Sequence, residues 1–120
     1  MDQKRATEKQ LKTPKIKVNY QDWGDLEGKQ GSPVIALHGL ASTSHWYNLL
    51  LPYLTNEYWC IAPDQRGHGK TDHPIYGYSW SDVASDVTDI MDKLNITKAS
   101  IIGHSWGAHV ALGLAALFPN

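Results

Sequence analysis

The stretch "SIIGHSWGAHVALGL", residues 100–114, decides the fold of this chain. An apolar run ends at Gly103, and a second apolar run, rich in glycine and alanine, begins shortly afterwards. Ser105 stands between the two runs. The change of pattern predicts a strand over residues 99–104 and a helix over residues 106–118, joined by a sharp turn.

The pattern G-x-S-x-G at this turn gives Ser105 chemical significance. A serine hydroxyl is a weak nucleophile and must stand clear of the backbone to reach a carbonyl group. The turn lifts Ser105 above the sheet, at the cost of unfavourable backbone angles at that residue. The residues two positions to either side then come so close that only small residues fit, which accounts for Gly103 and Gly107. The motif thus predicts a nucleophile, with a plain Gly/Ser turn as the alternative when the motif is taken alone.

Three further stretches predict strands. The apolar runs at 33–38 ("PVIALH") and 57–63 are typical of strands that are buried on both faces. An alternating stretch rich in β-formers predicts a strand at 15–22. We interpret residues 24–32 ("GDLEGKQGS") as a turn or hairpin loop.

Two more helices are expected between these strands. Residues 44–54 predict a helix that Pro52 kinks or ends early. Ser79 predicts the cap of another helix, with Asp82 as its capping-box partner. The apolar residues of this second helix recur at helical spacing up to Leu94. Strands that alternate with helices imply parallel βαβ units, and therefore a three-layer α/β sandwich with a mostly parallel sheet.

Two loops after predicted strands complete a recognisable set of motifs. The segment "VIALHGL" ends its strand with His38 and Gly39, where a chain turning over the sheet offers the backbone N–H of Leu40. The segment "PDQRGHGKT", residues 63–71, follows the next strand. With "GHSWG", this ordered set resembles the N-terminal half of the α/β-hydrolase fold family, over about residues 15–120.

The resemblance implies a role for each motif. Ser105 is implied as the nucleophile, and the backbone N–H groups of Leu40 and Trp106 as the oxyanion hole. The Asp64–Gly69 loop is implied as a structural turn beside the site. The residues implied to support the turn and the oxyanion loop are His38, Gly39, Gly103, His104 and Gly107.

The residue at position 105 separates branches of this family. Haloalkane dehalogenases and epoxide hydrolases resemble this chain in "GH-x-WG" but carry aspartate where this chain has Ser105. The resemblance therefore implies a serine esterase that acts on a small ester-like substrate through an acyl-enzyme, without metal or cofactor. Two alternatives are a hydrolase-fold pseudoenzyme or ligand-binding receptor, and a peptidase similar to the prolyl iminopeptidases, which share the pairing of "DQRG" with "SWG".

The partners that activate such a serine are not in the sequence. In this fold the catalytic order is Ser, then Asp or Glu, then His, but no acidic residue follows Ser105. His109 is the one histidine after Ser105. It lies on the helix that follows the turn, and we expect its side chain to point along that helix and not across the cleft toward Ser105. We therefore expect the chain to be the N-terminal part of a hydrolase, without its C-terminal strands and lid, and to be inactive by itself.

Two other classes of site are disfavoured. "RGHGKT" ends like a phosphate-binding loop, but such a loop requires glycine at the position of Asp64. A metal site would have to use the Asp and His residues of the same loop, which have no recognised ligand spacing. Those residues are Asp64, His68, Asp72 and His73.

Composition excludes other partners. The formal net charge of −1 gives no overall field that draws nucleic acid or a membrane surface. Cys60 is the only cysteine, so an internal disulfide is impossible. The N-terminus lacks the apolar core of a secretory signal, and we expect a cytoplasmic protein. Residues 1–14 are expected to be a basic, disordered tail, and residues 15–120 one partial α/β-hydrolase domain.

Overall fold

The computed structural model describes residues 6–24 and 31–118. The elements of this part of the chain are β1 (Thr7–Lys12), β2 (Lys17–Asp22), β3 (Ser32–Leu37), η1 (Ser44–Tyr47), η2 (Leu51–Tyr53), β4 (Tyr58–Pro63), α1 (Trp80–Lys93), β5 (Ser100–Gly103) and α2 (Trp106–Leu117). The strands form one sheet in the order β1-β2-β4-β3-β5. β3 pairs in parallel with β4 and β5, whereas β2 is antiparallel to both β1 and β4. The predicted α/β architecture is therefore confirmed.

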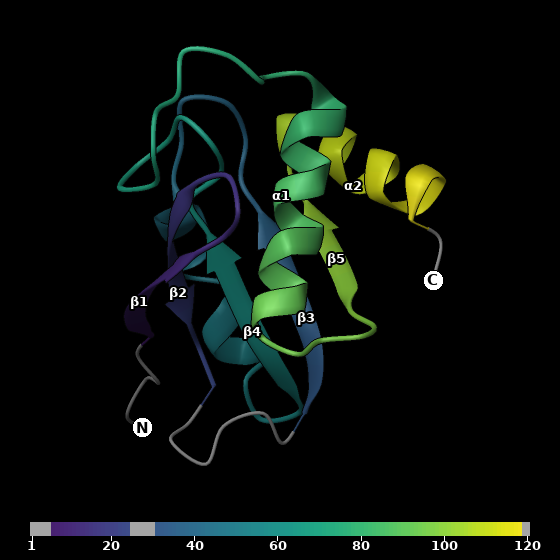
Figure 1. Cartoon of the computed structure of the whole chain (residues 1–120). Coiled ribbons are helices and arrows are strands. Elements are labelled where there is room, and N and C mark those ends of the chain that lie inside the picture. The colour runs from purple at the N-terminus through teal and green to yellow at the C-terminus, as the bar shows by residue number, and fades with distance from the viewer. Residues whose placement is uncertain (1–5, 25–30, 119–120) are drawn as a thin grey trace.

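Alternate residues of β3 face the two layers that cover the sheet. Ile35 and Leu37 are fully buried beneath α1 and α2, together with apolar residues such as Val83 and Val110. Val34 and Ala36 point to the other face, which the short 3-10 helices η1 and η2 cover. Figure 1 shows α1 lying across the sheet, with α2 beside it. A strand covered on both faces reads as a continuous apolar run, as residues 33–37 do.

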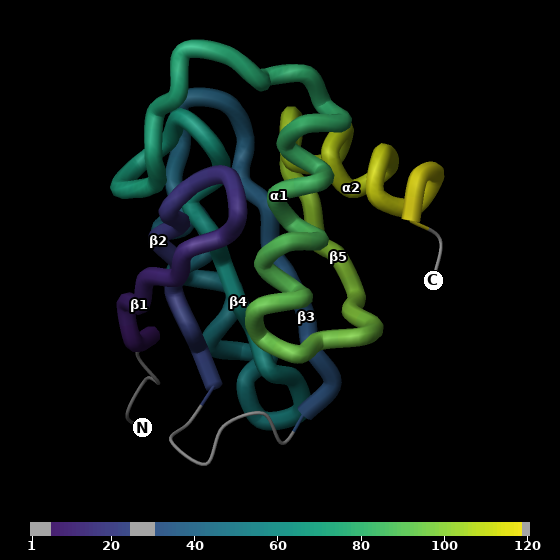
Figure 2. The backbone as a smooth tube through the Cα atoms, in the orientation of Figure 1, coloured from purple at the N-terminus to yellow at the C-terminus, as the bar shows by residue number. Residues whose placement is uncertain are grey.

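The carboxyl ends of the parallel strands meet at one edge of the sheet. β3, β4 and β5 run in the same direction in matched register. The loop from residue 64 to residue 79, drawn in teal, arches over this edge in Figure 2. Ligands of open α/β sheets bind beyond the carboxyl ends of the strands. The segments that follow the three strands therefore lie where a site is expected.

The N-terminal segment differs from the sequence-based expectation. Residues 7–12 form strand β1, which pairs along its whole length with β2, so the prediction of a disordered tail was wrong for this part. Residues 1–5 lie outside the described residues. Most of β1 is exposed, and its lysines suit the edge of a sheet because charged side chains there discourage further pairing.

Two further predictions, one of a hairpin loop and one of a helix, also need correction. β2 and β3 do not pair with each other, since each pairs with β4, so residues 24–32 do not close a hairpin; residues 25–30 lie outside the described residues. The helix expected over 44–54 is replaced by the two 3-10 helices, and Pro52 lies at the start of the second. Proline favours the first turn of a helix, where no backbone N–H is needed.

Helix α1 forms as its sequence predicts. The Ser79 side chain accepts the backbone N–H of Asp82, and the Asp82 carboxylate accepts the backbone N–H of Ser79, which completes a capping box. Its buried residues include Val83, Val87 and Ile90, one face of the helix. The cap and this apolar face fix where α1 begins and which side it turns to the sheet.

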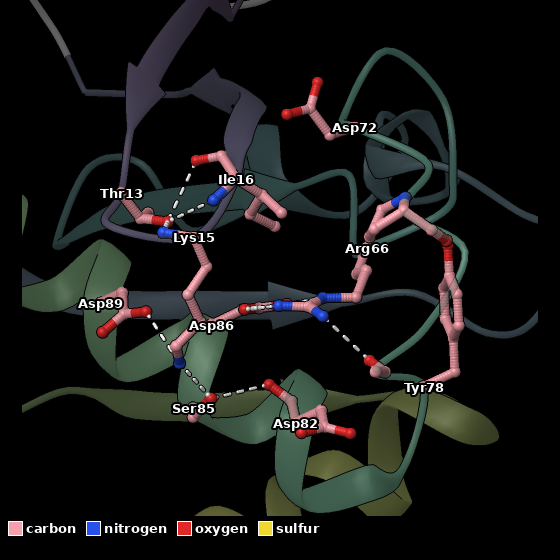
Figure 3. A network of polar contacts seen from close by, with 12 residues as sticks. Thr13, Lys15, Ile16, Arg66, Asp72, Tyr78, Asp82, Ser85, Asp86 and Asp89 are labelled. Carbon is pink, nitrogen blue, oxygen red and sulfur yellow. Dashed lines mark hydrogen bonds and ion pairs between the residues drawn. The ribbon is translucent and has the colours of Figure 1, made fainter.

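A buried ion pair ties the loop after β4 to α1. The Arg66 guanidinium donates two hydrogen bonds of 2.8 Å to the carboxylate of Asp86, and the two side chains are 8% and 6% exposed. Figure 3 shows this pair beside a second contact, in which Lys15 reaches Ser85 and Asp89 of the same helix. Arg66 also donates to the carbonyl of Gly77, 3.1 Å away. Both ends of the 66–77 loop are thus held by one side chain.

We expect Asp86→Ala to destabilise the protein by about 3 kcal/mol, because it leaves the Arg66 guanidinium buried without a counter-ion. Urea denaturation followed by circular dichroism measures the loss. Asp92→Ala is the matched control, since Asp92 is an exposed carboxylate of the same helix; its effect should stay within about 0.5 kcal/mol. Equal effects of the two substitutions would contradict this account of the ion pair.

Candidate functional site

Ser105 occupies a strained turn between β5 and α2. Its φ is 55° and its ψ is −116°, and it directly precedes the first residue of α2. Such angles cost a non-glycine residue about 1–3 kcal/mol and persist only where the surroundings impose them. The Ser105 residue is exposed, and its side chain makes no capping bond to α2. The strain that the motif predicts is therefore present, and the serine is open to solvent.

Close backbone contacts explain the glycines on either side. A Cβ atom on Gly103 would lie 2.5 Å from the carbonyl oxygen of Gly107. A Cβ atom on Gly107 would lie 2.1 Å from the carbonyl oxygen of Leu37. Both distances are far inside van der Waals contact, and the colliding atoms are backbone. The packing of α2 against the end of β3 therefore requires glycine at position 107.

The loop after β3 lies against this turn. A Cβ atom on Gly39 would lie 3.3 Å from the Cβ of Ser105, and the backbone N–H of His104 donates to the carbonyl of Leu37 at 3.1 Å. The backbone N–H groups of Leu40 and Trp106 donate to no other group among residues 6–24 and 31–118. The structure thus brings Ser105 close to the loop of Leu40, and neither amide group has a hydrogen-bond partner among the described residues.

The exposed histidines near Ser105 engage aromatic neighbours. The His104 ring stacks on the Trp46 ring at a centroid distance of 4.6 Å and an angle of 22°. His109 lies 6.2 Å from the Trp106 ring, on α2. Within the described residues, no histidine or carboxylate hydrogen-bonds to the Ser105 hydroxyl. The sequence pattern did not single out the Trp46–His104 stack, because the two residues lie on segments far apart in the chain.

Asp64 is fully engaged in holding its own loop. Its carboxylate accepts the backbone N–H groups of Ser44 at 2.8 Å and of Lys70 at 3.0 Å, and the side-chain amide of Asn19 at 3.0 Å. Burial acts to raise the pKa of Asp64, but these hydrogen bonds outweigh it and leave the pKa below its ordinary value. Gly69, with φ of 51°, packs directly against the carboxylate. In the part of the chain that is described, no three His, Cys, Asp or Glu side chains are grouped to hold a metal ion.

His38 is buried at the end of β3 between two backbone groups. Its Nε2 accepts the backbone N–H of Gln65 at 2.9 Å, and its Nδ1 lies 2.7 Å from the carbonyl oxygen of Gly39. Burial lowers the pKa of His38; the Gly39 carbonyl and Asp64 oppose this change, and the neighbouring imidazole of His68 adds to it. The imidazole is therefore held neutral in the folded protein.

A lowered histidine pKa makes stability fall in acid. Between the folded and unfolded pKa values of His38, the unfolded chain binds more protons, so the free energy of unfolding decreases as the pH falls below about 6.5. We expect His38→Asn, which cannot titrate there, to show a shallower decrease between pH 7 and pH 5 than the natural chain. Thermal melts across this range measure both slopes, and identical slopes would contradict the prediction.

The open side of β5 borders a groove of about 570 Å³. Among the described strands, β5 pairs with β3 alone. The groove is lined mostly by apolar side chains, including Ile101 of β5, Leu112 of α2 and Phe118, which follows α2. Of the helices in residues 6–24 and 31–118, none has the length and hydropathy of a membrane-spanning segment.

Comparisons with known proteins show the family of the chain. The family model described as alpha/beta hydrolase fold matches residues 32–120. A serine hydrolase-like protein of Danio rerio is 38% identical over 105 residues, covering 82% of this chain and 32% of that protein. A non-heme chloroperoxidase of Streptomyces lividans is 39% identical over 91 residues, covering 75% of this chain and 32% of that protein.

A solved structure has the same fold as this chain. Epoxide hydrolase A from Mycobacterium thermoresistibile superposes with a TM-score of 0.88 at 27% identity, over 95% of this chain and 36% of that chain. The chain spans about a third of the length of the curated relatives named above. Because the family model matches residues 32–120, which is most of the chain, the chain belongs to the alpha/beta hydrolase fold family.

Proposed function

We propose that Ser105 is the nucleophile of a serine hydrolase that cleaves small ester-like molecules through an acyl-enzyme. The observation that carries the proposal is the conformation of Ser105. A residue with φ of 55°, fixed between two glycines whose replacement would cause backbone collisions, presents an exposed hydroxyl at the carboxyl end of the parallel sheet. A plain turn between a strand and a helix has no need of this strain.

The same geometry supports a mechanism for acyl transfer. The Ser105 hydroxyl attacks the ester carbonyl, and its proton passes to a general base. The carbonyl oxygen becomes negatively charged and accepts the backbone N–H groups of Leu40 and Trp106, which have no other partner among the described residues. Trp106 begins α2, so the positive end of the helix dipole also favours this charge. The intermediate collapses to an acyl-enzyme as the protonated base donates its proton to the departing alcohol. The same base then takes a proton from water, which attacks the acyl-enzyme; the acid leaves, and the proton returns to Ser105.

We propose that the general base belongs to a longer protein, since the chain spans about a third of the length of the curated relatives named above. His104 stacks on Trp46, and no described histidine or carboxylate contacts the Ser105 hydroxyl. We therefore propose that residues 1–120 supply the nucleophile and the oxyanion hole of a longer protein. The remainder of that protein would supply the histidine, its carboxylate and the lid. By itself, the 120-residue chain is expected to be inactive toward esters.

A fluorophosphonate probe tests this proposal, since it labels a serine that a base has activated. The full-length protein should be labelled at Ser105, as peptide mass spectrometry would show, and should hydrolyse p-nitrophenyl esters of short acids. The 120-residue chain should show neither reaction. If the full-length protein binds such esters without turnover or labelling, it is a binding protein of the same fold. Cleavage of prolyl-naphthylamide in place of the esters would instead indicate a peptidase.

A further inference from the structure

Two imidazoles hold the loop that carries Leu40. On one side of Leu40, His38 Nδ1 lies 2.7 Å from the carbonyl oxygen of Gly39. On the other side, the backbone N–H of Ala41 donates to His68 Nε2 at 3.1 Å. The two rings meet edge to face with centroids 4.8 Å apart. The loop is therefore held from both ends by a pair of histidines that touch each other.

The contact with His38 fixes the direction of the Leu40 N–H. The carbonyl of Gly39 and the N–H of Leu40 belong to one planar trans peptide unit, so they point in opposite directions. A carbonyl anchored on the buried His38 ring therefore aims the Leu40 N–H away from that ring. This is the amide that the proposed mechanism places in the oxyanion hole.

The contact with His68 stabilises a strained residue on the other side. Ala41 has φ of 60°, in the left-handed region that alanine seldom occupies. The Ala41 N–H makes no hydrogen bond to a backbone carbonyl within residues 6–24 and 31–118, so its bond to His68 is what holds Ala41 in that conformation. Leu40 lies between the two anchored peptide units, so relaxation of Ala41 would also turn the Leu40 peptide.

The partners of both rings require them to be neutral. The Gln65 N–H donates to His38 Nε2, so the proton of His38 is on Nδ1 and donates to Gly39. The Ala41 N–H donates to His68 Nε2, so the proton of His68 is on Nδ1 and donates to the carbonyl of Arg66, 3.0 Å away. A second proton, on the Nε2 of either ring, would point at the N–H group that now donates to that atom, and the hydrogen bond would be lost.

Two neighbouring ionisable groups act on the charge of His38 in opposite directions. Asp64 attracts a positive charge on His38, whereas the His68 ring opposes one. The Arg66 guanidinium is directed to Asp86 on α1.

We propose that His38 and His68, both neutral and protonated on Nδ1, are positioning residues that hold the Leu40 N–H in the oxyanion hole. This inference rests on the proposed function of Ser105 and Leu40. Neither imidazole reacts with substrate; each acts through the backbone of the loop.

Two substitutions of His68 separate the two sides of its ring. Glutamine places an oxygen acceptor near the position of Nε2 and can still accept the Ala41 N–H. Asparagine is shorter, reaches only the position of Nδ1 and leaves that N–H without a partner. In the full-length protein we expect His68→Asn to lower kcat for an ester by about tenfold with KM changed less than twofold, because a misaligned oxyanion donor weakens the transition state selectively. His68→Gln should recover most of the loss.

Amide hydrogen exchange gives a readout that does not depend on activity. Exchange at Ala41 should accelerate at least tenfold in His68→Asn and remain slow in His68→Gln, at equal melting temperatures. His73→Gln, an exposed loop histidine, is the control and should change neither kcat nor exchange. Equal behaviour of the Asn and Gln variants overturns this inference alone. Full activity in Ser105→Ala would instead overturn the proposed function, and this inference with it.

Discussion

Replacing Ser105 by alanine should lower kcat/KM for ester hydrolysis by the full-length protein by about ten-thousand-fold or more. The methyl group of alanine cannot form the acyl-enzyme, so only the oxyanion hole and substrate binding remain to act on the uncatalysed attack of water. The backbone should be unaffected or slightly relaxed, because the strain at φ of 55° belongs to the turn and not to the hydroxyl. The comparison is made by steady-state kinetics with a p-nitrophenyl ester.

The control for Ser105→Ala is Ser100→Ala. Ser100 is an exposed serine at the start of the same strand, β5, and it lies outside the proposed site. Its replacement should change kcat/KM by less than twofold. A Ser105→Ala variant that keeps more than a tenth of the activity would show that another group carries the reaction.

The second large effect is on stability, at Gly107. A methyl group there would lie 2.1 Å from the carbonyl oxygen of Leu37. That oxygen also accepts hydrogen bonds from His104 and from the hydroxyl of Tyr47, so it cannot move without loss of both. We expect Gly107→Ala to destabilise the protein by about 3 kcal/mol or more, through overpacking of backbone against backbone. Urea denaturation measures the change.

Gly113 provides a matched control on the same helix. A Cβ atom there would meet the ring of Trp80 at 2.4 Å, but Trp80 is 44% exposed as a residue, and its ring can turn aside. The gain in helix propensity from alanine, about 1 kcal/mol, offsets part of the cost. If Gly107→Ala were as mild as Gly113→Ala, the packing of α2 against β3 would not require glycine.

Much of the fold could be predicted because local signals and tertiary packing agree. The sequences of the buried strands β3, β4 and β5 are apolar runs, and the capping box of α1 is a pattern within four adjacent residues. β1 could not be predicted in this way, since its residues are mostly exposed and polar. It is held by pairing with β2 and by contacts such as the 2.8 Å bond from Lys9 to Asp22. Such contacts depend on a partner distant in the sequence.

The segment 44–54 shows how tertiary bonds override a local pattern. Its composition favours a helix, but the backbone N–H of Ser44 donates to the Asp64 carboxylate, and Pro52 lies in the first turn of a second short helix. Several apolar residues of the segment remain exposed, including Leu49 and Tyr53. Helical periodicity therefore does not describe which of them are buried.

The candidate site likewise has one part that the local sequence predicts and another part that depends on contacts between distant segments. Ser105 and its flanking glycines follow from five adjacent residues. The role of His68 has no such local signature, because its partner, the Ala41 N–H, lies 27 residues earlier. Only the meeting of the loops after β3 and β4 at one edge of the sheet brings the two together. A pattern search detects the motif of each loop but not the contact between them.

A crystal structure of the full-length protein after reaction with a fluorophosphonate tests the central claim most directly. The phosphorus atom should be bonded to Ser105 Oγ, and its phosphoryl oxygen should accept hydrogen bonds of about 3 Å from the backbone N–H groups of Leu40 and Trp106. An adduct on any other residue would contradict the claim. So would a phosphoryl oxygen that faces solvent while those two amides stay unpaired.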